Sequence, residues 1–198
     1  MNEKEAMENL EMIKKMIEET KKTVAYSGDI FILWGVLGLL ACLGTYVLVF
    51  FRLYQYIFIN WVGLMTIGFA YSIYRGVTQE KKEKIITFST KALGYTWFAL
   101  GITLMLLGFV APLAGVYSSY HMIPAIIAIV IGAGCFISAQ LYQWKLLTWL
   151  SLLWWGAGIG MMFLKTDSSL LVFAFLIILG YLVPGFILQA NYKKQKRE

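Results

Sequence analysis

Acidic side chains are almost missing from the long central part of this 198-residue sequence. Between residues 30 and 190 the only acidic residues are Glu80, Glu83 and Asp167, and all three lie in polar segments between apolar runs. Ion-coupled transporters usually place Asp, Glu or His within their membrane spans, because a charge at that depth is costly and is retained where function needs it. The apolar runs therefore contain no carboxylate that could bind a coupling proton or sodium ion.

Histidine and cysteine are also scarce. The one histidine, His121, lies between two apolar runs, and the two cysteines, Cys42 and Cys135, lie inside such runs. These residues cannot supply a metal-ligand set or a Ser/His or Cys/His pair, and the carboxylates that Mg²⁺ needs are not clustered. We expect no enzyme, no cofactor and no metal. The cysteines are expected to be reduced packing residues rather than a disulfide, and His121 to be an interfacial residue rather than a ligand.

Charged residues of both signs make up 14% of the chain, whereas 60% of the residues are apolar. Soluble domains are roughly 45–50% apolar, so the composition indicates an integral membrane protein. Six apolar runs reach the roughly 20 residues that a helix needs to cross a bilayer, and they are continuous rather than alternating. We predict an all-α fold, a polytopic bundle of six transmembrane helices. The spans are expected at about 30–51, 56–74, 92–115, 122–142, 146–164 and 170–190.

Lysine and arginine indicate how the bundle is oriented. Most of the 17 basic residues lie before the first span, between spans two and three, and in the tail 192–198, whereas the opposite side keeps Arg52 and Lys165. Positive residues favour the cytoplasmic side, so both termini are predicted to be cytoplasmic. The net charge is +6. Direct nucleic-acid binding is not expected, because the basic residues form no single stripe.

The segment 1–28 differs from the spans because its apolar residues are spaced as on one face of a helix. Ala6, Leu10, Ile13, Ile17, Thr20 and Val24 follow heptad spacing, which predicts a cytoplasmic amphipathic helix before the membrane domain 29–191. The partner-binding candidates on this stripe are Leu10, Ile13, Ile17 and Val24. Two interpretations stay open: the stripe packs on the membrane or on the protein's own loops, or it docks a second chain.

A few polar and aromatic residues near the spans are candidates for lining a cavity. They are Asn60, Trp97, Thr103, Trp154 and Trp155. Polar groups in membrane bundles usually bond to neighbouring helices or to their own backbone, and a polar cavity is the sharper alternative.

Glycines follow single helix faces in several spans and predict close helix packing, with a substrate-facing surface as the alternative. The helix-packing candidates are Gly35, Gly38, Gly101, Gly108, Gly132, Gly156 and Gly160. Pro124 and Pro184 are expected to interrupt spans four and six. Trp-x-x-x-Gly recurs in the odd spans, at Trp34, Trp97 and Trp154, which suggests three related hairpins.

Several short stretches resemble a family of small bacterial six-span inner-membrane proteins with a charged N-terminal helix. They are Met1-Asn2-Glu3-Lys4-Glu5, Met16-Ile17, Thr20-Lys21, Gly28-Asp29-Ile30-Phe31-Ile32-Leu33-Trp34-Gly35 and Gly180-Tyr181-Leu182-Val183-Pro184-Gly185. The resemblance implies the same layout in a bacterial inner membrane. It brings no catalytic or binding residues.

Two functions fit these observations. The first is a non-enzymatic membrane anchor, sensor or interaction module that acts through its cytoplasmic helix, with membrane lipids, a second copy or a cytoplasmic protein as partner. The second is a small transporter or substrate-capturing subunit for a neutral or apolar solute, which would use the aromatic residues rather than charge.

Overall fold

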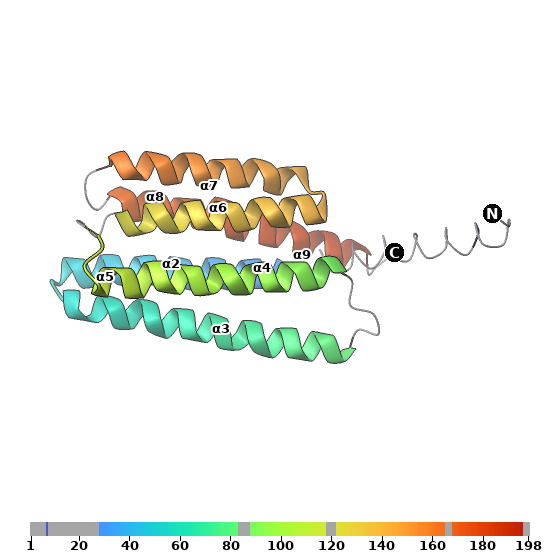
Figure 1. Ribbon diagram of the computed structural model, residues 1–198, viewed down its shortest axis with the longest axis horizontal. Helices are drawn as coiled ribbons and strands as arrows, with labels where there is room; N and C mark the ends of the chain where they lie inside the picture. The colour runs from blue at the N-terminus through green and yellow to red at the C-terminus, as the bar shows by residue number, and fades with distance from the viewer. Residues whose placement is uncertain (1–6, 8–27, 83–87, 118–121, 165–167, 196–198) are drawn as a thin grey trace.

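The chain folds into an elongated bundle of helices. The structure is a computed structural model that describes residues 7, 28–82, 88–117, 122–164 and 168–195. These described ranges contain helices and no strands (Figure 1). The helices in chain order are α2 Gly28–Phe50, the 3-10 turn η1 Tyr54–Tyr56, α3 Ile57–Lys82, α4 Phe88–Met105, the π-helix η2 Leu106–Val110, α5 Ala111–Leu113, α6 Met122–Tyr142, α7 Lys145–Phe163, α8 Ser168–Ile177, the π-helix η3 Ile178–Leu182 and α9 Val183–Gln195.

Six segments are long and apolar enough to cross a membrane, which confirms the predicted fold class. They are Gly28–Phe50, Tyr54–Thr78, Lys91–Leu113, Met122–Tyr142, Lys145–Phe163 and Ser168–Asn191. Their ends differ from the predicted ends by at most four residues. Hydrophobic length fixes these segments because a helix rises about 1.5 Å per residue and the hydrocarbon core is about 30 Å thick.

The two prolines that were expected to interrupt spans differ from each other. Pro124 lies in the first turn of α6, where a backbone N–H has no helical acceptor, so α6 runs unbroken and the predicted interruption at Pro124 is wrong. Pro184 follows the π-helix η3, and Pro112 follows the π-helix η2. A proline removes a hydrogen bond and crowds the preceding turn, and a widened π turn relieves that crowding.

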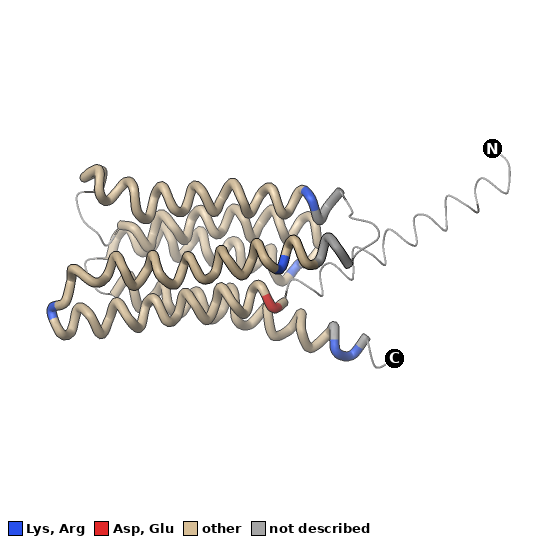
Figure 2. The backbone as a smooth tube through the Cα atoms, turned by 90° about the horizontal axis from the view of Figure 1, so that it is seen from below, with Lys and Arg blue, Asp and Glu red and all other residues tan. Residues whose placement is uncertain are grey.

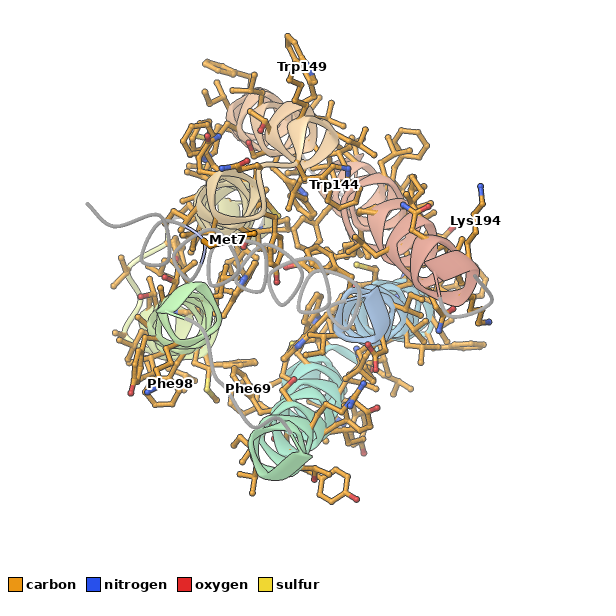
Figure 3. The ribbon with its side chains drawn as sticks, turned by 90° about the vertical axis from the view of Figure 1, so that its right-hand side faces the viewer. Met7, Phe69, Phe98, Trp144, Trp149 and Lys194 are labelled. Carbon is orange, nitrogen blue, oxygen red and sulfur yellow. The ribbon has the colours of Figure 1, made fainter. Side chains whose placement is uncertain are left out.

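The helices form an open ring in which consecutive spans pack on one another, with the exception of α3 and α4 (Figure 3). α3 packs on α2, and α2 packs on the segments α8, η3 and α9. Of these three, α8 and η3 pack on α7, α7 packs on α6, and α6 packs on α4. The ring ends are therefore α3 and α4, which are neighbours in sequence but do not pack their backbones closely in the described part of the chain.

The buried core lies on the side of the ring away from α3 and α4. Leu147, Trp154 and Met161 of α7 and Cys135 of α6 are fully buried, and Phe173 of α8 is nearly so. In the most apolar window of each span, 6% of residues are buried in α3 and in α4, compared with 28–44% in the other four. α3 and α4 are thus the least covered helices of the bundle.

Charge is concentrated at the end of the bundle where α2 begins and α9 ends (Figure 2). Arg75 lies near the end of α3, Lys91 and Lys145 lie in the first turns of α4 and α7, and Lys193 and Lys194 lie in the last turn of α9. Arg52 lies in the turn between α2 and η1, at the opposite end of α2. This arrangement follows from the alternation of six spans along the chain.

Candidate functional site

An ion pair joins α2 and α3 at the charged end of the bundle. Asp29 lies in the first turn of α2, and Arg75 lies near the end of α3. The Arg75 Nε donates to Asp29 Oδ2 at 3.1 Å, and a second guanidinium nitrogen bonds the same oxygen. The Arg75 and Asp29 side chains are 24% and 34% exposed, so the pair is partly shielded from solvent. Charge-assisted bonds of this kind are about twice as strong as neutral ones.

The start of α2 is also held on its other side, by α9. An ideal Cβ built at Gly28 would lie 2.9 Å from the Gly185 carbonyl oxygen and 3.0 Å from the Gln189 backbone nitrogen. Only a residue without a side chain allows the two backbones to come this close. The first turn of α2 is therefore fixed between α3 and α9.

Further hydrogen bonds join α2 to α3 along their length. Near the charged end, Trp34 Nε1 donates to Ser72 Oγ at 3.2 Å. Nearer the other end, Asn60 Nδ2 donates to the Ala41 carbonyl oxygen at 2.9 Å, and Trp61 Nε1 donates to Thr45 Oγ1 at 2.8 Å. Each of these three donors thus has a partner on the adjacent helix, as a low-dielectric surrounding requires.

Two more tryptophans tie α6 to its neighbours. Trp97 of α4 donates from Nε1 to Ser138 Oγ at 3.0 Å, and that hydroxyl donates in turn to the Gly134 carbonyl oxygen at 2.8 Å. Trp155 of α7 donates from Nε1 to the Ile129 carbonyl oxygen at 3.0 Å. These bonds fix the rotation of α4 and α7 against α6.

Trp154 occupies the aromatic centre of the core. Its ring lies edge-on to Phe173 and Tyr181, with centroids 5.9 and 5.8 Å away, and Tyr181 also contacts Phe31 of α2 at 5.6 Å. The indole packs directly over Gly180, where an ideal Cβ would lie 2.6 Å from Trp154 Cε2. Its Nε1 is buried without a hydrogen-bond partner.

The three Trp-x-x-x-Gly motifs therefore have two different surroundings. Trp34 and Trp97 each donate to a serine of the following span, Ser72 and Ser138. Trp154 instead packs on Gly180 of the following span. The first two hairpins share this contact, and the third does not.

The contacts between α3 and α4 are aromatic. Phe69 of α3 rests on Gly101 of α4, where an ideal Cβ would lie 3.0 Å from Phe69 Cε1. Phe58 of α3 meets Phe109 of η2 with ring centroids 5.6 Å apart. Figure 3 looks along the bundle from its charged end and shows Phe69 between α3 and α4. We call this junction the α3–α4 seam.

The five cavity candidates lie in separate places. Asn60 is bonded within the α2–α3 hairpin, and Trp97 lies between α4 and α6. Trp154 and Trp155 flank Gly132 from α7, on the side of α6 that faces α7. Thr103 is exposed and donates to the Ala99 carbonyl oxygen of its own helix at 3.0 Å.

Five of the helix-packing glycines contact side chains of neighbouring elements. Gly35, Gly38, Gly101, Gly108 and Gly132 face Leu182, Ile177, Phe69, Ile127 and Trp155 respectively. Gly156 and Gly160 have nothing within 4 Å of an ideal Cβ. They differ because α7 buries the face of Leu147, Trp154 and Met161, which turns the Gly156–Gly160 face outward.

The partner-binding candidates Leu10, Ile13, Ile17 and Val24 lie outside the described residues, as does His121. Cys42 and Cys135 are buried free thiols. Across residues 28–82, 88–117, 122–164 and 168–195, no three His, Cys, Asp or Glu side chains gather as a metal site would require. The site is therefore a set of interhelical contacts with one ion pair at its charged end.

Burial affects one titratable group in the segment between α5 and α6. Desolvation raises the pKa of the Tyr117 phenol above its usual value. The protonated hydroxyl donates to the Leu107 carbonyl oxygen of η2 at 2.9 Å. This bond satisfies one carbonyl of the π-helix near Pro112.

Sequence reasoning missed the Asp29–Arg75 pair and the Phe69–Gly101 contact. The pair had a usable signal: Asp29 begins the first predicted span and Arg75 ends the second, and an antiparallel hairpin brings these two ends together. Phe69 had no such signal, because one phenylalanine among 13 says nothing about which helix it meets.

No protein-family model matches this chain, and neither do the curated proteins or solved structures with which it was compared.

Proposed function

We propose that this protein is a non-enzymatic membrane protein that docks a second chain through its N-terminal segment 1–28, with the six spans serving as the anchor. One observation supports this proposal above the others: the start of α2 is held from both sides, by Arg75 of α3 and by the backbone of α9. The start of α2, where the segment 1–28 joins the spans, is therefore a fixed point at the charged end.

Chemistry at this end favours docking over catalysis. The apolar stripe of Leu10, Ile13, Ile17 and Val24 provides a surface that a second helix covers well, in the manner of a coiled coil. Arg75 already neutralises the charge of Asp29, so Asp29 does not offset the positive charge of the lysines at this end. The excess of positive charge supports an orientation with both termini in the cytoplasm.

Site-specific photocrosslinking tests the docking function in intact membranes. A photoreactive phenylalanine at Leu10, Ile13 or Ile17 should give one discrete adduct with a second polypeptide, because these positions face the partner. The same residue at Glu8, Lys15 or Lys22, on the opposite side of the helix, should not. Mass spectrometry of the adduct separates a second copy of this chain from another protein.

The double substitution Ile13→Glu and Ile17→Glu provides the functional variant. It should abolish the adduct from Leu10 while the spans stay folded, which the thermal unfolding of the detergent-solubilised protein checks. Crosslinks confined to lipid or to the protein's own chain, from every stripe position, would show that the segment lies on the membrane and would reject docking.

A second candidate function is capture of a neutral or apolar solute, and the light packing of α3 and α4 favours it. An uncharged fatty alcohol that carries a diazirine is a suitable probe in proteoliposomes. Labelling should concentrate on the facing sides of α3 and α4, around Phe69 and Phe98. Equal labelling of all the helices that face lipid would count against capture.

A further inference from the structure

The α3–α4 seam is joined at two points and open beyond them. Phe58 and Phe109 meet toward the Arg52 end, and Phe69 meets Gly101 near the middle. One and two turns further toward the charged end, the same face of α3 carries Ile73 and Gly76. There Ile73 is 64% exposed, and an ideal Cβ at Gly76 has nothing within 4 Å.

The facing side of α4 is open over the same length. Gly94 and Phe98 share a helix face with Gly101, at spacings of seven and three residues. Phe98 is 65% exposed, and nothing lies within 4 Å of an ideal Cβ at Gly94. Phe69 thus marks where the open half of the seam begins among the described residues.

α3 is held more firmly to α2, and α4 to α6, than α3 and α4 are held to each other. α3 is held to α2 by the Asp29–Arg75 pair and by the bonds that Trp34 and Trp61 donate. α4 is held to α6 by the bond from Trp97 to Ser138. Across the seam itself, the described contacts are aromatic rings and a glycine, which have no directional bond to break.

A change of helix type marks where α4 could bend. The π-helix η2 begins directly after Met105, one turn beyond Gly101, and Pro112 follows it. Sharp bends in helices occur at prolines and at π segments. Phe109 and the carbonyl that Tyr117 binds belong to this segment, so the Arg52 end of the seam is anchored there.

We propose that the α3–α4 seam is a lateral gate toward the bilayer, closed by Phe69 on Gly101 and hinged at η2. In the closed state Phe69 also stacks edge-on against Trp34, with ring centroids 5.2 Å apart. In the open state Phe69 leaves Gly101, and the charged-end half of α4 tilts away from α3 about the Trp97–Ser138 bond, which stays formed, while the Phe58–Phe109 contact holds. This gate is independent of the docking function, because it uses no residue of the segment 1–28.

Electron–electron distance measurements between spin labels test the gate in proteoliposomes. Labels replace Ile73 on α3 and Phe98 on α4, in a full-length background where Cys42 and Cys135 are alanine. A control pair replaces the exposed Ile137 of α6 and Leu152 of α7, two helices that pack closely. We expect a longer second distance for the seam pair and one narrow distance for the control pair.

Two substitutions should enlarge the population with the longer distance several-fold. Phe69→Ala removes the ring that closes the seam, and Gly101→Ala places a methyl group where Phe69 rests. Phe175→Ala, a lipid-facing change on α8, is the matched control and should leave both distances unchanged. An unaltered control-pair distance shows that a variant is folded.

A single narrow seam distance that neither Phe69→Ala nor Gly101→Ala moves, in protein with the control distance intact, would overturn the gate. Such a result would leave the crosslinking test of docking unaffected, since that test reports contacts of the segment 1–28.

Discussion

At the scale of single residues, large side chains of this protein pack on glycines of adjacent helices. Trp154 rests on Gly180, Phe69 on Gly101 and Leu182 on Gly35. In a bilayer such close approach is a main source of helix association, because lipid chains are as apolar as the side chains and no hydrophobic gain drives the helices together. A single added methyl group is therefore a sharp test of each contact.

Gly180→Ala is expected to destabilise the protein by about 1–3 kcal/mol, the usual cost of overpacking a filled interior. Its new Cβ would lie 2.6 Å from Trp154 Cε2, and Trp154 is enclosed by Phe173 and Tyr181, so the indole cannot move away freely. Thermal unfolding of the detergent-solubilised protein measures the loss. Gly156→Ala, at a position with open space, is the matched control and should leave stability unchanged or raise it slightly.

Trp97→Phe should cost about 1–2 kcal/mol, since it removes one interhelical hydrogen bond and part of a packed ring. Ser138 would keep its bond to the Gly134 carbonyl, so no buried hydroxyl is left without a partner. The same unfolding measurement compares it with Trp149→Phe, a change at a side chain that is 70% exposed. Equal losses in the two variants would mean that the bond to Ser138 contributes nothing.

At the scale of elements, the Asp29–Arg75 pair makes α2 and α3 one unit. Removing either charge should cost about 0.5–1 kcal/mol, because both side chains are partly exposed and solvent screens the pair. The swapped variant Asp29→Arg with Arg75→Asp should regain part of the loss, although an arginine in the first turn of a helix opposes the helix dipole. A double-mutant cycle on unfolding free energies gives the coupling, and a coupling of zero would show that the two charges act independently.

Element boundaries followed from hydrophobic length, whereas the irregular turns within the elements did not. Composition and run length predicted all six spans. A continuous apolar run in lipid forms a helix, because a helix pairs the backbone polar groups of the run within the run itself. Pro124 was expected to break its span and does not, since the helix begins only two residues earlier at Met122. The π-helices before Pro112 and Pro184 depend on neighbours that a linear reading does not show.

At the scale of the whole molecule, the distribution of charge predicts which end faces the cytoplasm. An impermeant maleimide applied to intact cells should label Tyr54→Cys, next to Arg52, and should label Lys194→Cys only after the membrane is permeabilised. Both positions are exposed, and Cys42 and Cys135 are replaced by alanine to remove background. Labelling with the opposite preference would invert the proposed topology.

The order of helices around the ring was beyond the sequence. Hydrophobic runs indicate how many helices cross the membrane. When every face of a helix is apolar, however, hydrophobicity does not indicate which helix packs on which face. The predicted cavity candidates Trp97 and Trp154 show the difficulty, because they lie on opposite sides of α6 and each satisfies a separate packing contact. Of the candidate site, only the Asp29–Arg75 pair could have been predicted from the sequence, because the two opposite charges lie at the ends of the two spans that meet in one hairpin.

The α2–α3 hairpin carries a consequence for biogenesis. Its ion pair and the bonds of Trp34, Asn60 and Trp61 all join residues between positions 29 and 75, so none of them needs a later helix. As the chain leaves the ribosome from its N-terminus, these two spans can enter the lipid with their opposite charges already cancelled. We expect the later helices to pack onto this hairpin, with α9 packing against Gly28 last because it is synthesised last.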